Sequence, residues 1–345
     1  MRALTISAHG TLDNLEYRTD LPIPDVSAGL VRVRVTYAAL NHLDLFMLEG
    51  LPGVTLRPPW IMGADATGTV DAIGDDSITH MKLGDTVVIN PGISDRTCEY
   101  CRSGEQSLCV HFGILGEHHP GALAELIVVP AANVRRISAE IPRPEAAAFT
   151  LSALTAWRMV VTRAKVTPDD DVLIWGIGGG VALAALAIVK QIGAHTWVTS
   201  GSEEKLARAR ELGADETLNH RTSDVGKEIR SRTGKKGVDV VIDNVGHDTW
   251  KQSLIALGRQ GRLVTCGATS GPMVETDVRR LFWNQWTIMG STMGNDAEFE
   301  AVTKEISAGR LMPVIDSVFD LRNGADAFRR LASGDHFGKI VVRVE

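Results

Sequence analysis

Three of the four cysteines in this 345-residue chain lie close together and follow an aspartate, in the pattern Asp95-x2-Cys98-x2-Cys101-x7-Cys109. A C-x2-C spacing lets two thiolates bind one tetrahedral ion, and a third thiolate with a carboxylate completes the coordination shell. Such a closed set of four ligands is structural, because no position stays open for a substrate. The pattern predicts one structural zinc ion per chain, with three free thiols as the alternative.

A second motif, Trp175-Gly-Ile-Gly-Gly-Gly-Val-Ala182, lies between a strand-like and a helical segment. Its glycines allow a tight turn close to a pyrophosphate, and the helix N-terminus offers free N–H groups and a positive dipole. Val181 stands where G-x-G-x-x-G has its third glycine, but small residues recur as Gly176-x-x-Gly179-x-x-Ala182. The motif predicts a dinucleotide site that includes Gly176, Gly179, Gly180 and Val181.

The end of the next strand favours NADPH, with NADH as the alternative. An NAD site usually has an acidic residue about 20 residues after the glycine turn, to bind the ribose 2′-OH. Ser200 stands there instead, which removes a charge that would repel a 2′-phosphate. Basic groups further on, at Lys205, His220 and Arg221, could neutralise that phosphate. We assign Ser200, Ser202, Lys205 and His220 to this end of the cofactor site.

The expected secondary structure changes near residue 144, from mainly strands to a mixture of helices and strands. Before it, alternating and β-branched segments predict an irregular, barrel-like β region. These strands are expected at Val31–Tyr37, Gly63–Ile73, Thr86–Ile89 and Ala122–Pro130, followed by a helix over Pro144–Trp157.

From residue 171 onward, strand-like and helical segments alternate, which predicts a parallel sheet with helices on both faces. The expected strands are Val172–Trp175, Thr196–Thr199, Val238–Asp243 and Gly261–Cys266. The expected helices are Val181–Ile192, Glu203–Leu212, Asp248–Leu257 and Ala325–Leu331. A last strand, Lys339–Val344, is expected to return to the first domain.

The composition is typical of a globular protein and argues against several other classes of protein. Hydrophobic residues make up 44% and charged residues 23% of the chain, as in globular proteins. The net charge is −6, with no basic block, which argues against nucleic acid or an anionic membrane as partner. No apolar run approaches the roughly 20 residues that cross a bilayer, and no signal peptide is evident. Four cysteines are too few for a disulfide scaffold, so we expect a cytoplasmic enzyme.

Taken together, the chain resembles the medium-chain dehydrogenase/reductase superfamily nearly from end to end. Besides the two motifs above, the likeness rests on Gly63-Ala-Asp-Ala-Thr-Gly-Thr-Val70, Gly84-Asp-Thr-Val-Val88, Leu154-Thr-Ala-Trp157, Leu212-Gly-Ala-Asp215, Asp243-Asn-Val-Gly246 and Phe337-Gly-Lys-Ile-Val341. The resemblance implies an α/β fold: a GroES-like β-rich catalytic domain (residues 1–152 and 293–345) and a Rossmann doubly wound parallel sheet (153–292). It also implies NAD(P)-dependent hydride transfer and a homodimer or homotetramer.

The chain departs from the zinc alcohol dehydrogenases of this superfamily at the catalytic metal. Asn41 replaces the first ligand, Cys; Ala64 replaces the His; and Leu151 falls where the third ligand belongs. Neither Ala64 nor Leu151 can donate electrons to a metal, so we expect no catalytic zinc. The pattern, with Asn41 and Asp44, resembles the zinc-free quinone oxidoreductases, although that branch usually lacks the cysteine lobe.

Without a Lewis acid, the acceptor must already be electron-poor. Quinones and α,β-unsaturated carbonyls qualify, and weak donors can stabilise their developing oxyanion. We therefore predict an NAD(P)H-dependent reductase of such small molecules. Asn41 is expected to be the oxyanion donor, and Asp44 to orient Asn41 or a water. His42 is expected to relay a proton or touch the pyrophosphate, with a neutral, buried His42 that makes only structural hydrogen bonds as the alternative. An alcohol or aldehyde dehydrogenase and a non-catalytic NADPH-binding protein are the alternatives.

The resemblance also assigns further residues to the cofactor. Thr155 and Ser291 are similar to positions beside the nicotinamide, and Lys339 to the basic residue near the diphosphate. Four residues at the carboxyl ends of later strands are expected to line the cofactor site, where open α/β sheets bind ligands: Asn244, Val245, Gly267 and Ala268.

Overall fold

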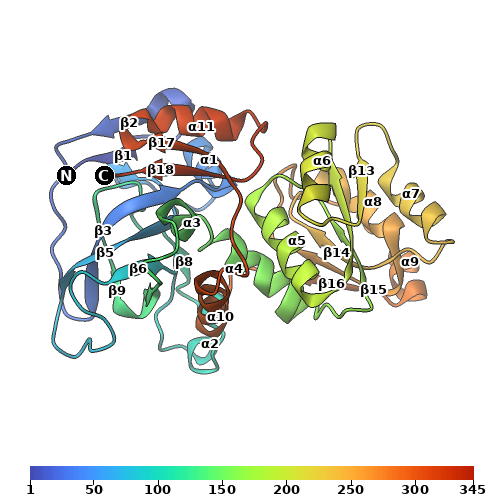
Figure 1. Ribbon diagram of the computed structural model, residues 1–345, viewed down its shortest axis with the longest axis horizontal. Coiled ribbons are helices and arrows are strands. Elements are labelled where there is room, and N and C mark those ends of the chain that lie inside the picture. The colour runs from blue at the N-terminus through green and yellow to red at the C-terminus, as the bar shows by residue number, and fades with distance from the viewer. The chain divides into compact units, whose positions relative to one another are not determined.

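The computed structural model describes all 345 residues, which divide into two compact units. Unit 1 consists of Met1–Leu154 and Gly294–Glu345, and unit 2 of Thr155–Met293. Both ends of the chain belong to unit 1 (Figure 1). No helix in either unit has the length and apolarity needed to span a bilayer.

Unit 1 is built around the long strand β3 (Leu30–Ala39), which pairs with three other strands. Its main sheet has the order β10-β6-β5-β3-β18-β17, with β9 also paired to β3. These strands are β5 (Asp65–Ile73), β6 (Thr86–Ile89), β9 (Leu126–Pro130), β10 (Val134–Arg136), β17 (Ile315–Asp320) and β18 (Lys339–Arg343). Strand β18 does return to the first domain, where Val341 faces Ala39 in antiparallel register.

Two smaller sheets complete the strands of unit 1. One has the order β2-β1-β4, formed by β1 (Ala3–Ile6), β2 (Leu15–Arg18) and β4 (Trp60–Ile61). The other is the pair β7 (Gly92–Ile93) and β8 (Gly113–Ile114), and the cysteine lobe is the excursion between them. The helices assigned here are α1 (His42–Glu49), α2 (Glu99–Arg102), α3 (Arg143–Ala147), α10 (Asp296–Ser307) and α11 (Gly324–Ala332).

The single helix expected over Pro144–Trp157 is wrong, because the chain breaks there. Helix α3 ends at Ala147, and α4 (Ser152–Trp157) begins after a turn and runs into a π-helix over Arg158–Arg163. In the turn, the Thr150 hydroxyl and the Leu151 N–H donate to the Asp65 carboxylate, at 2.6 and 2.7 Å. The buried carboxylate thus takes the Leu151 N–H that a continuous helix would have bonded internally, and the Thr150 hydroxyl adds a second hydrogen bond.

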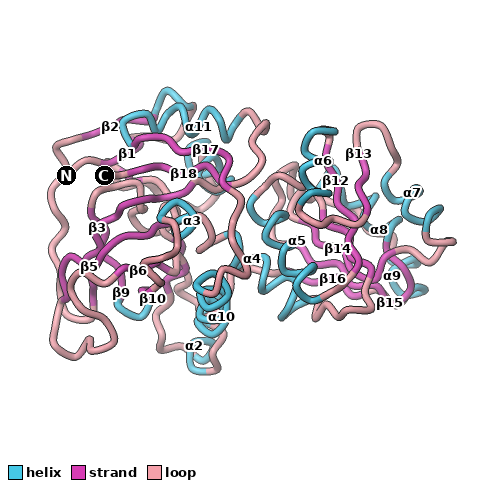
Figure 2. Tube along the Cα trace, in the orientation of Figure 1, coloured by secondary structure: helices cyan, strands magenta, loops and turns pink.

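Unit 2 is a six-stranded parallel sheet in the order β13-β12-β11-β14-β15-β16 (Figure 2). Its strands are β11 (Asp171–Ile174), β12 (His195–Ser200), β13 (Glu216–Asn219), β14 (Val238–Asp243), β15 (Leu257–Thr265) and β16 (Thr287–Gly290). Its helices are α5 (Gly180–Ile192), α6 (Glu203–Glu211), α7 (Val225–Arg232), α8 (His247–Ala256) and α9 (Val278–Asn284). The order reverses between β11 and β14, the switch point at which doubly wound sheets bind ligands. The α/β fold class is confirmed.

Candidate active site and metal lobe

A buried polar cluster lies where several elements of unit 1 begin. Asn41 precedes helix α1, Asp65 is the first residue of β5, and Lys339 is the first residue of β18. The three side chains are 8%, 0% and 4% exposed, respectively. Burying polar and charged groups is costly unless they bind one another, so their contacts define the cluster.

Asp65 and Lys339 form its ion pair. The Lys339 ammonium Nζ donates to Asp65 Oδ2 at 3.0 Å and to Asn41 Oδ1 at 2.5 Å. The Asn41 amide Nδ2 donates to the same Asp65 oxygen at 3.0 Å. The second Asp65 oxygen is the one bound by the turn at Thr150 and Leu151. A negative and a positive charge therefore compensate each other in the interior, with the amide of Asn41 fixed between them.

Asp44 is the second buried carboxyl group, and it is only 2% exposed. Its oxygens accept the backbone N–H groups of Asn41 at 2.7 Å and Gly63 at 3.1 Å. Burial raises the pKa of Asp44 from 3.8 to about 7, against the opposing effects of those hydrogen bonds and of the Lys339 charge. Asp44 thus fixes the backbone at residues 41 and 63.

The three predicted catalytic residues are placed differently from one another. The Asn41 side chain is in the polar cluster, but Asp65 and Lys339 orient it, whereas Asp44 orients only the Asn41 backbone. His42 is an exposed residue whose ring meets the edge of Phe46, with ring centroids 5.9 Å apart, and partial burial of the imidazole lowers its pKa. Lys339, which resembles a diphosphate-binding residue, directs its ammonium to Asn41 and Asp65.

These residues do not fit a catalytic zinc ion. At the three positions where the related enzymes have ligands, only Asn41 has a donor atom, and its Oδ1 accepts a hydrogen bond from Lys339. Ala64 and Leu151 have hydrocarbon side chains. A dication would also lie close to the positive charge of Lys339. The counter-charge of Lys339, the Asp65 carboxylate, already accepts four hydrogen bonds, and no thiolate is present.

The cysteine lobe does fit a structural zinc ion. One ligand atom from each of Asp95, Cys98, Cys101 and Cys109 lies within 4.8 Å of all the others. The four cysteines of the chain are free thiols, so none is lost to a disulfide. Three thiolates and one carboxylate are a donor set that zinc accepts in tetrahedral geometry.

Asp95 is held in place for this role. Its Oδ2 contacts His111 Nδ1 at 2.8 Å, and its Oδ1 accepts the N–H groups of Thr97 and Cys98 at 2.8 and 3.0 Å. These hydrogen bonds, led by that of His111, hold the pKa of the Asp95 carboxyl well below its usual range. His111 is a residue that the spacing of the cysteines did not indicate; a histidine behind a ligating carboxylate orients it.

The glycine turn of unit 2 fits the pyrophosphate of a dinucleotide. Gly176 and Gly178 have φ values of +70° and +121°, which side chains rarely tolerate. The turn is fastened to the neighbouring strand, because the Ile177 N–H donates to the Thr199 carbonyl at 2.8 Å. Helix α5 then begins at Gly180, and a Cβ built on Gly179 would meet only the Gly176 carbonyl, at 3.8 Å. The backbone is therefore open at the helix N-terminus, as a phosphate requires.

The predicted ribose end comes together at the end of β12. Ser200 is buried, its Oγ accepts the Ser202 N–H at 3.2 Å, and Ser202 caps helix α6 through the Lys205 N–H. A Cβ built on Gly201 would lie 2.6 Å from Arg221 Nε and 3.1 Å from His220 Nε2. Two basic side chains thus cover the backbone of this turn, and no acidic residue stands at position 200.

The other predicted cofactor residues of unit 2 form a row along the carboxyl edge of its sheet. Val245 lies 3.7 Å from the Cβ position of Gly176, and the Asn244 carbonyl lies 3.2 Å from that of Gly267, which Ala268 follows. The Ser291 N–H donates to the Thr265 carbonyl at 2.8 Å. Thr155 lies at the start of the unit, where its hydroxyl contacts the sulfur of Met293 at 3.7 Å.

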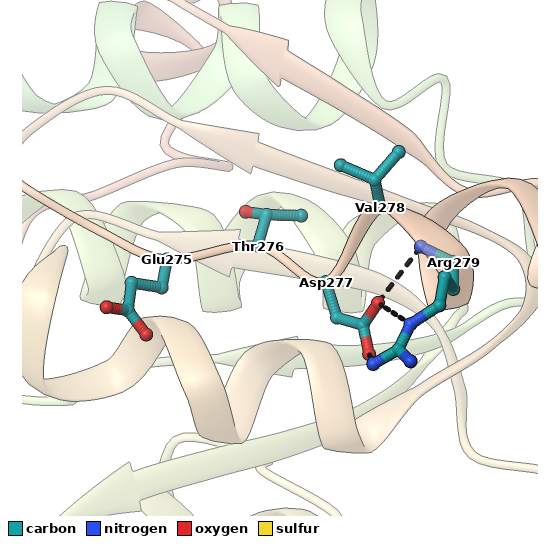
Figure 3. Close-up of a pocket in the computed structure, with 5 residues that line it drawn as sticks. All are labelled: Glu275, Thr276, Asp277, Val278 and Arg279. Atoms are coloured by element: carbon teal, nitrogen blue, oxygen red, sulfur yellow. Dashed lines mark hydrogen bonds and ion pairs between the residues drawn. The ribbon is translucent and has the colours of Figure 1, made fainter.

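Sequence reasoning missed Asp65 and Thr150 as parts of the polar cluster. Asp65 stands in the motif at the place of the glutamate of Gly-His-Glu, which was the one available signal. Its partner Lys339 is 274 residues away, so no spacing could have linked them. The open hollow drawn in Figure 3, lined by Glu275, Thr276, Asp277, Val278 and Arg279, contains none of the predicted site residues.

Comparison with known proteins identifies the family. Residues 27–139 match the model of the alcohol dehydrogenase GroES-like domain, and residues 180–308 match that of the zinc-binding dehydrogenases. The chain belongs to the zinc-type alcohol dehydrogenases of the medium-chain dehydrogenase/reductase superfamily, as its motifs indicated. It is an NAD(P)-dependent oxidoreductase.

Three similar proteins illustrate the range of the family. An NAD-dependent alcohol dehydrogenase of Sulfurisphaera tokodaii is 30% identical, with 99% of each chain covered. A quinone oxidoreductase of Homo sapiens is 25% identical, covering 99% of this chain and 97% of its own. A crystal structure described as an NAD-dependent alcohol dehydrogenase superposes with a TM-score of 0.94 at 41% identity, with all of both chains covered.

Proposed function

We propose that the protein reduces quinones or α,β-unsaturated carbonyl compounds by hydride transfer from NADPH, without a catalytic zinc ion. The observation that carries the proposal is the Asn41–Asp65–Lys339 cluster, which takes up the one donor atom left at the three metal-ligand positions. An ordinary ketone needs a Lewis acid to become electron-poor enough for hydride, whereas a conjugated acceptor spreads the developing charge by itself. The human quinone oxidoreductase is a relative that fits this chemistry.

Each unit has a part in the proposed reaction. In unit 2 the glycine turn and the N-terminus of α5 hold the pyrophosphate, and the bound nicotinamide supplies the hydride. In unit 1 Asn41 offers a neutral N–H donor to the acceptor's oxygen, and Asp44 fixes the backbone that carries Asn41. The zinc of the cysteine lobe has a structural part only.

NADPH is proposed over NADH because of the turn after β12. Ser200 places no negative charge where an NAD site has its carboxylate. Arg221 and His220, which follow strand β13, cover Gly201. A 2′-phosphate would meet a charge-assisted donor there, and a 2′-OH would lack its usual carboxylate.

The test is NADPH oxidation by the purified protein with a quinone and with an enone, before and after dialysis against a chelator. Circular dichroism of the same samples checks that the structural lobe has not unfolded. We expect turnover of both acceptors to survive in folded protein with zinc only in the lobe. Activity that disappears on chelation in folded protein, and returns with zinc, would refute the proposal.

An alcohol or aldehyde dehydrogenase is the second candidate, and the observation that favours it is the similarity to two proteins described as NAD-dependent alcohol dehydrogenases. It predicts oxidation of simple alcohols with NAD and no turnover of enones. The same preparation, assayed in both directions with both nucleotides, separates the two candidates.

We also propose that two copies of the chain associate through the outer edge of unit 2. Strand β16 pairs only with β15, so its other edge is open. Beside it, helix α9 and the segment before it expose the apolar side chains Met273, Val278, Phe282 and Trp283. An apolar patch next to an open strand edge is typical of a self-association surface. The four free thiols suit the reducing cytoplasm that we propose as the location.

A further inference from the structure

The ammonium group of Lys339 has a hydrogen atom that no partner uses. Two of its three N–H bonds point to Asn41 Oδ1 and Asp65 Oδ2, at 2.5 and 3.0 Å. The Asn41 amide also has an unused N–H group, since one N–H of Nδ2 donates to Asp65 and the other has no acceptor. Because both nitrogens donate to the same Asp65 oxygen, at 3.0 Å each, the two unused N–H groups belong to neighbouring atoms of the cluster.

Burial decides what could reach these donors. Asn41 and Lys339 each keep a small exposed surface, 8% and 4%, while their partner Asp65 keeps none. The accessible surface of the cluster therefore belongs to the two residues that carry the unused donors, and none of it to the carboxylate. The Asp65 charge holds the ammonium in place and offsets the cost of its burial.

We propose that Lys339, together with Asn41, forms the oxyanion site of the enzyme, so that an ammonium ion serves where the related enzymes use a metal. This inference rests on the proposed function and adds a second, charged donor to the one that Asn41 provides. It assigns Lys339 to the acceptor's oxygen, a role separate from binding the diphosphate.

The chemistry balances with the groups already named. A hydride, with its two electrons, leaves the reduced nicotinamide and forms a C–H bond at the electron-poor carbon of the acceptor, and the nicotinamide becomes oxidised. The electron pair displaced from the conjugated system comes to rest on the acceptor's oxygen, as an enolate or a phenolate. Lys339 and Asn41 donate hydrogen bonds to that oxygen, which later takes a proton from water. A single positive charge stabilises it less than a dication does, which explains why only activated acceptors suffice.

The test compares Lys339→Met with Lys339→Arg and with Lys304→Met, an exposed lysine of the same unit paired with Glu300. Because Lys339→Met leaves the Asp65 charge buried and alone, the double variant Asp65→Asn/Lys339→Met removes both charges and keeps the fold measurable. We expect kcat to fall about 100-fold or more in either variant, as for loss of one oxyanion donor. The fall should be larger for an enone than for a quinone, because an enolate is the more basic anion. Lys339→Arg should recover part of kcat, and Lys304→Met should match wild type.

A binding experiment without turnover separates this inference from the proposed function. 4-Nitrophenol, whose anion absorbs visibly, is titrated in the presence of oxidised cofactor. Wild type should bind the phenolate and lower the pKa of the bound phenol, and the double variant should not, while both bind NADPH equally by fluorescence. Phenolate binding that depends on Lys339, in a protein that reduces neither acceptor, would leave the inference standing and overturn the function. If the double variant keeps the kcat and the phenolate binding of wild type, or if only its KM for NADPH rises, the inference is overturned and the proposed function stands.

Discussion

Arg96, in the cysteine lobe, places its Nη1 atom 2.6 Å from Oδ2 of Asp296, the first residue of helix α10, although 200 residues separate them in sequence. Its Nη2 also contacts Asn133, and the Gln106 side chain of the lobe accepts the Asp296 N–H at 3.2 Å. The lobe is thus fastened to the helix with which the chain re-enters unit 1. A zinc ion bound in the lobe would therefore support helix α10 as well as its own loop.

Removal of zinc should destabilise α10 together with the lobe. Replacing Cys101 by Ala takes away one of the four proposed ligands, so the folding free energy that the metal supplies to the lobe is lost. We expect a lower melting temperature and faster hydrogen exchange in residues 296–307, with less than one zinc per chain by elemental analysis. Cys266→Ala, outside the lobe, is the control and should keep its zinc. Unchanged exchange in α10 after complete loss of zinc would contradict the coupling.

Replacing Asp44 by Asn should flatten the dependence of stability on pH. Because burial raises the pKa of Asp44 to about 7, the native state keeps a proton that the unfolded chain releases above about pH 4. This group therefore stabilises the native state most at low pH, and the contribution is lost as pH rises to 7, by at most about 4 kcal/mol. Urea unfolding from pH 5 to pH 8 measures it. Parallel curves for wild type and Asp44→Asn would show that the carboxyl titrates normally.

Arg221→Ala should weaken NADPH binding and leave NADH binding nearly unchanged. Loss of a charge-assisted hydrogen bond to the 2′-phosphate costs about 1.5–3 kcal/mol, or roughly a 10- to 100-fold rise in the dissociation constant. Fluorescence titration with both nucleotides measures the ratio. Arg232→Ala, in an exposed ion pair with Glu228 on α7, is the matched control. Equal losses for NADPH and NADH would place Arg221 away from the phosphate.

Replacing Phe282 and Trp283 by Ser should dissociate the proposed dimer. These side chains are 64% and 69% exposed in the single chain, so the substitution costs the monomer little stability. Light scattering after size-exclusion chromatography should show wild type at twice the chain mass or more, and the variant at one. Leu212→Ser, another exposed apolar side chain of unit 2, should leave the mass unchanged. If wild type is a monomer in this measurement, the proposal of a dimer is refuted.

The sequence predicted most accurately the elements whose signals are local. Strands β6 and β14 have the expected limits, and the helix after the glycine turn begins one residue early, at Gly180. The cysteine spacing likewise predicted that Asp95, Cys98, Cys101 and Cys109 lie together, since all four are in one short excursion of the chain. Hydrophobic periodicity and turn residues determine such features within a few residues.

Features that depend on distant partners could not be predicted in this way. The Ala- and Leu-rich segment after Pro144 has the pattern of a continuous helix, and only the carboxylate of Asp65 explains its break. The motif around Lys339 indicates a residue near the cofactor diphosphate. A motif does not, however, give the direction in which a long, flexible side chain points. That direction depends on the pairing of β18 with β3, which brings residue 339 beside residue 41.

The same pairing makes the order of synthesis matter. A ribosome that has not yet translated residue 339 has already produced Asp65 and the turn that binds it, yet the counter-charge of that carboxylate does not exist. We expect the nascent β region to keep Asp65 hydrated or protonated, and to close fully only when strand β18 arrives. Catalytic competence should therefore appear abruptly, late in translation, and a product interrupted before Lys339 should be an open, protease-sensitive chain and not a slow enzyme.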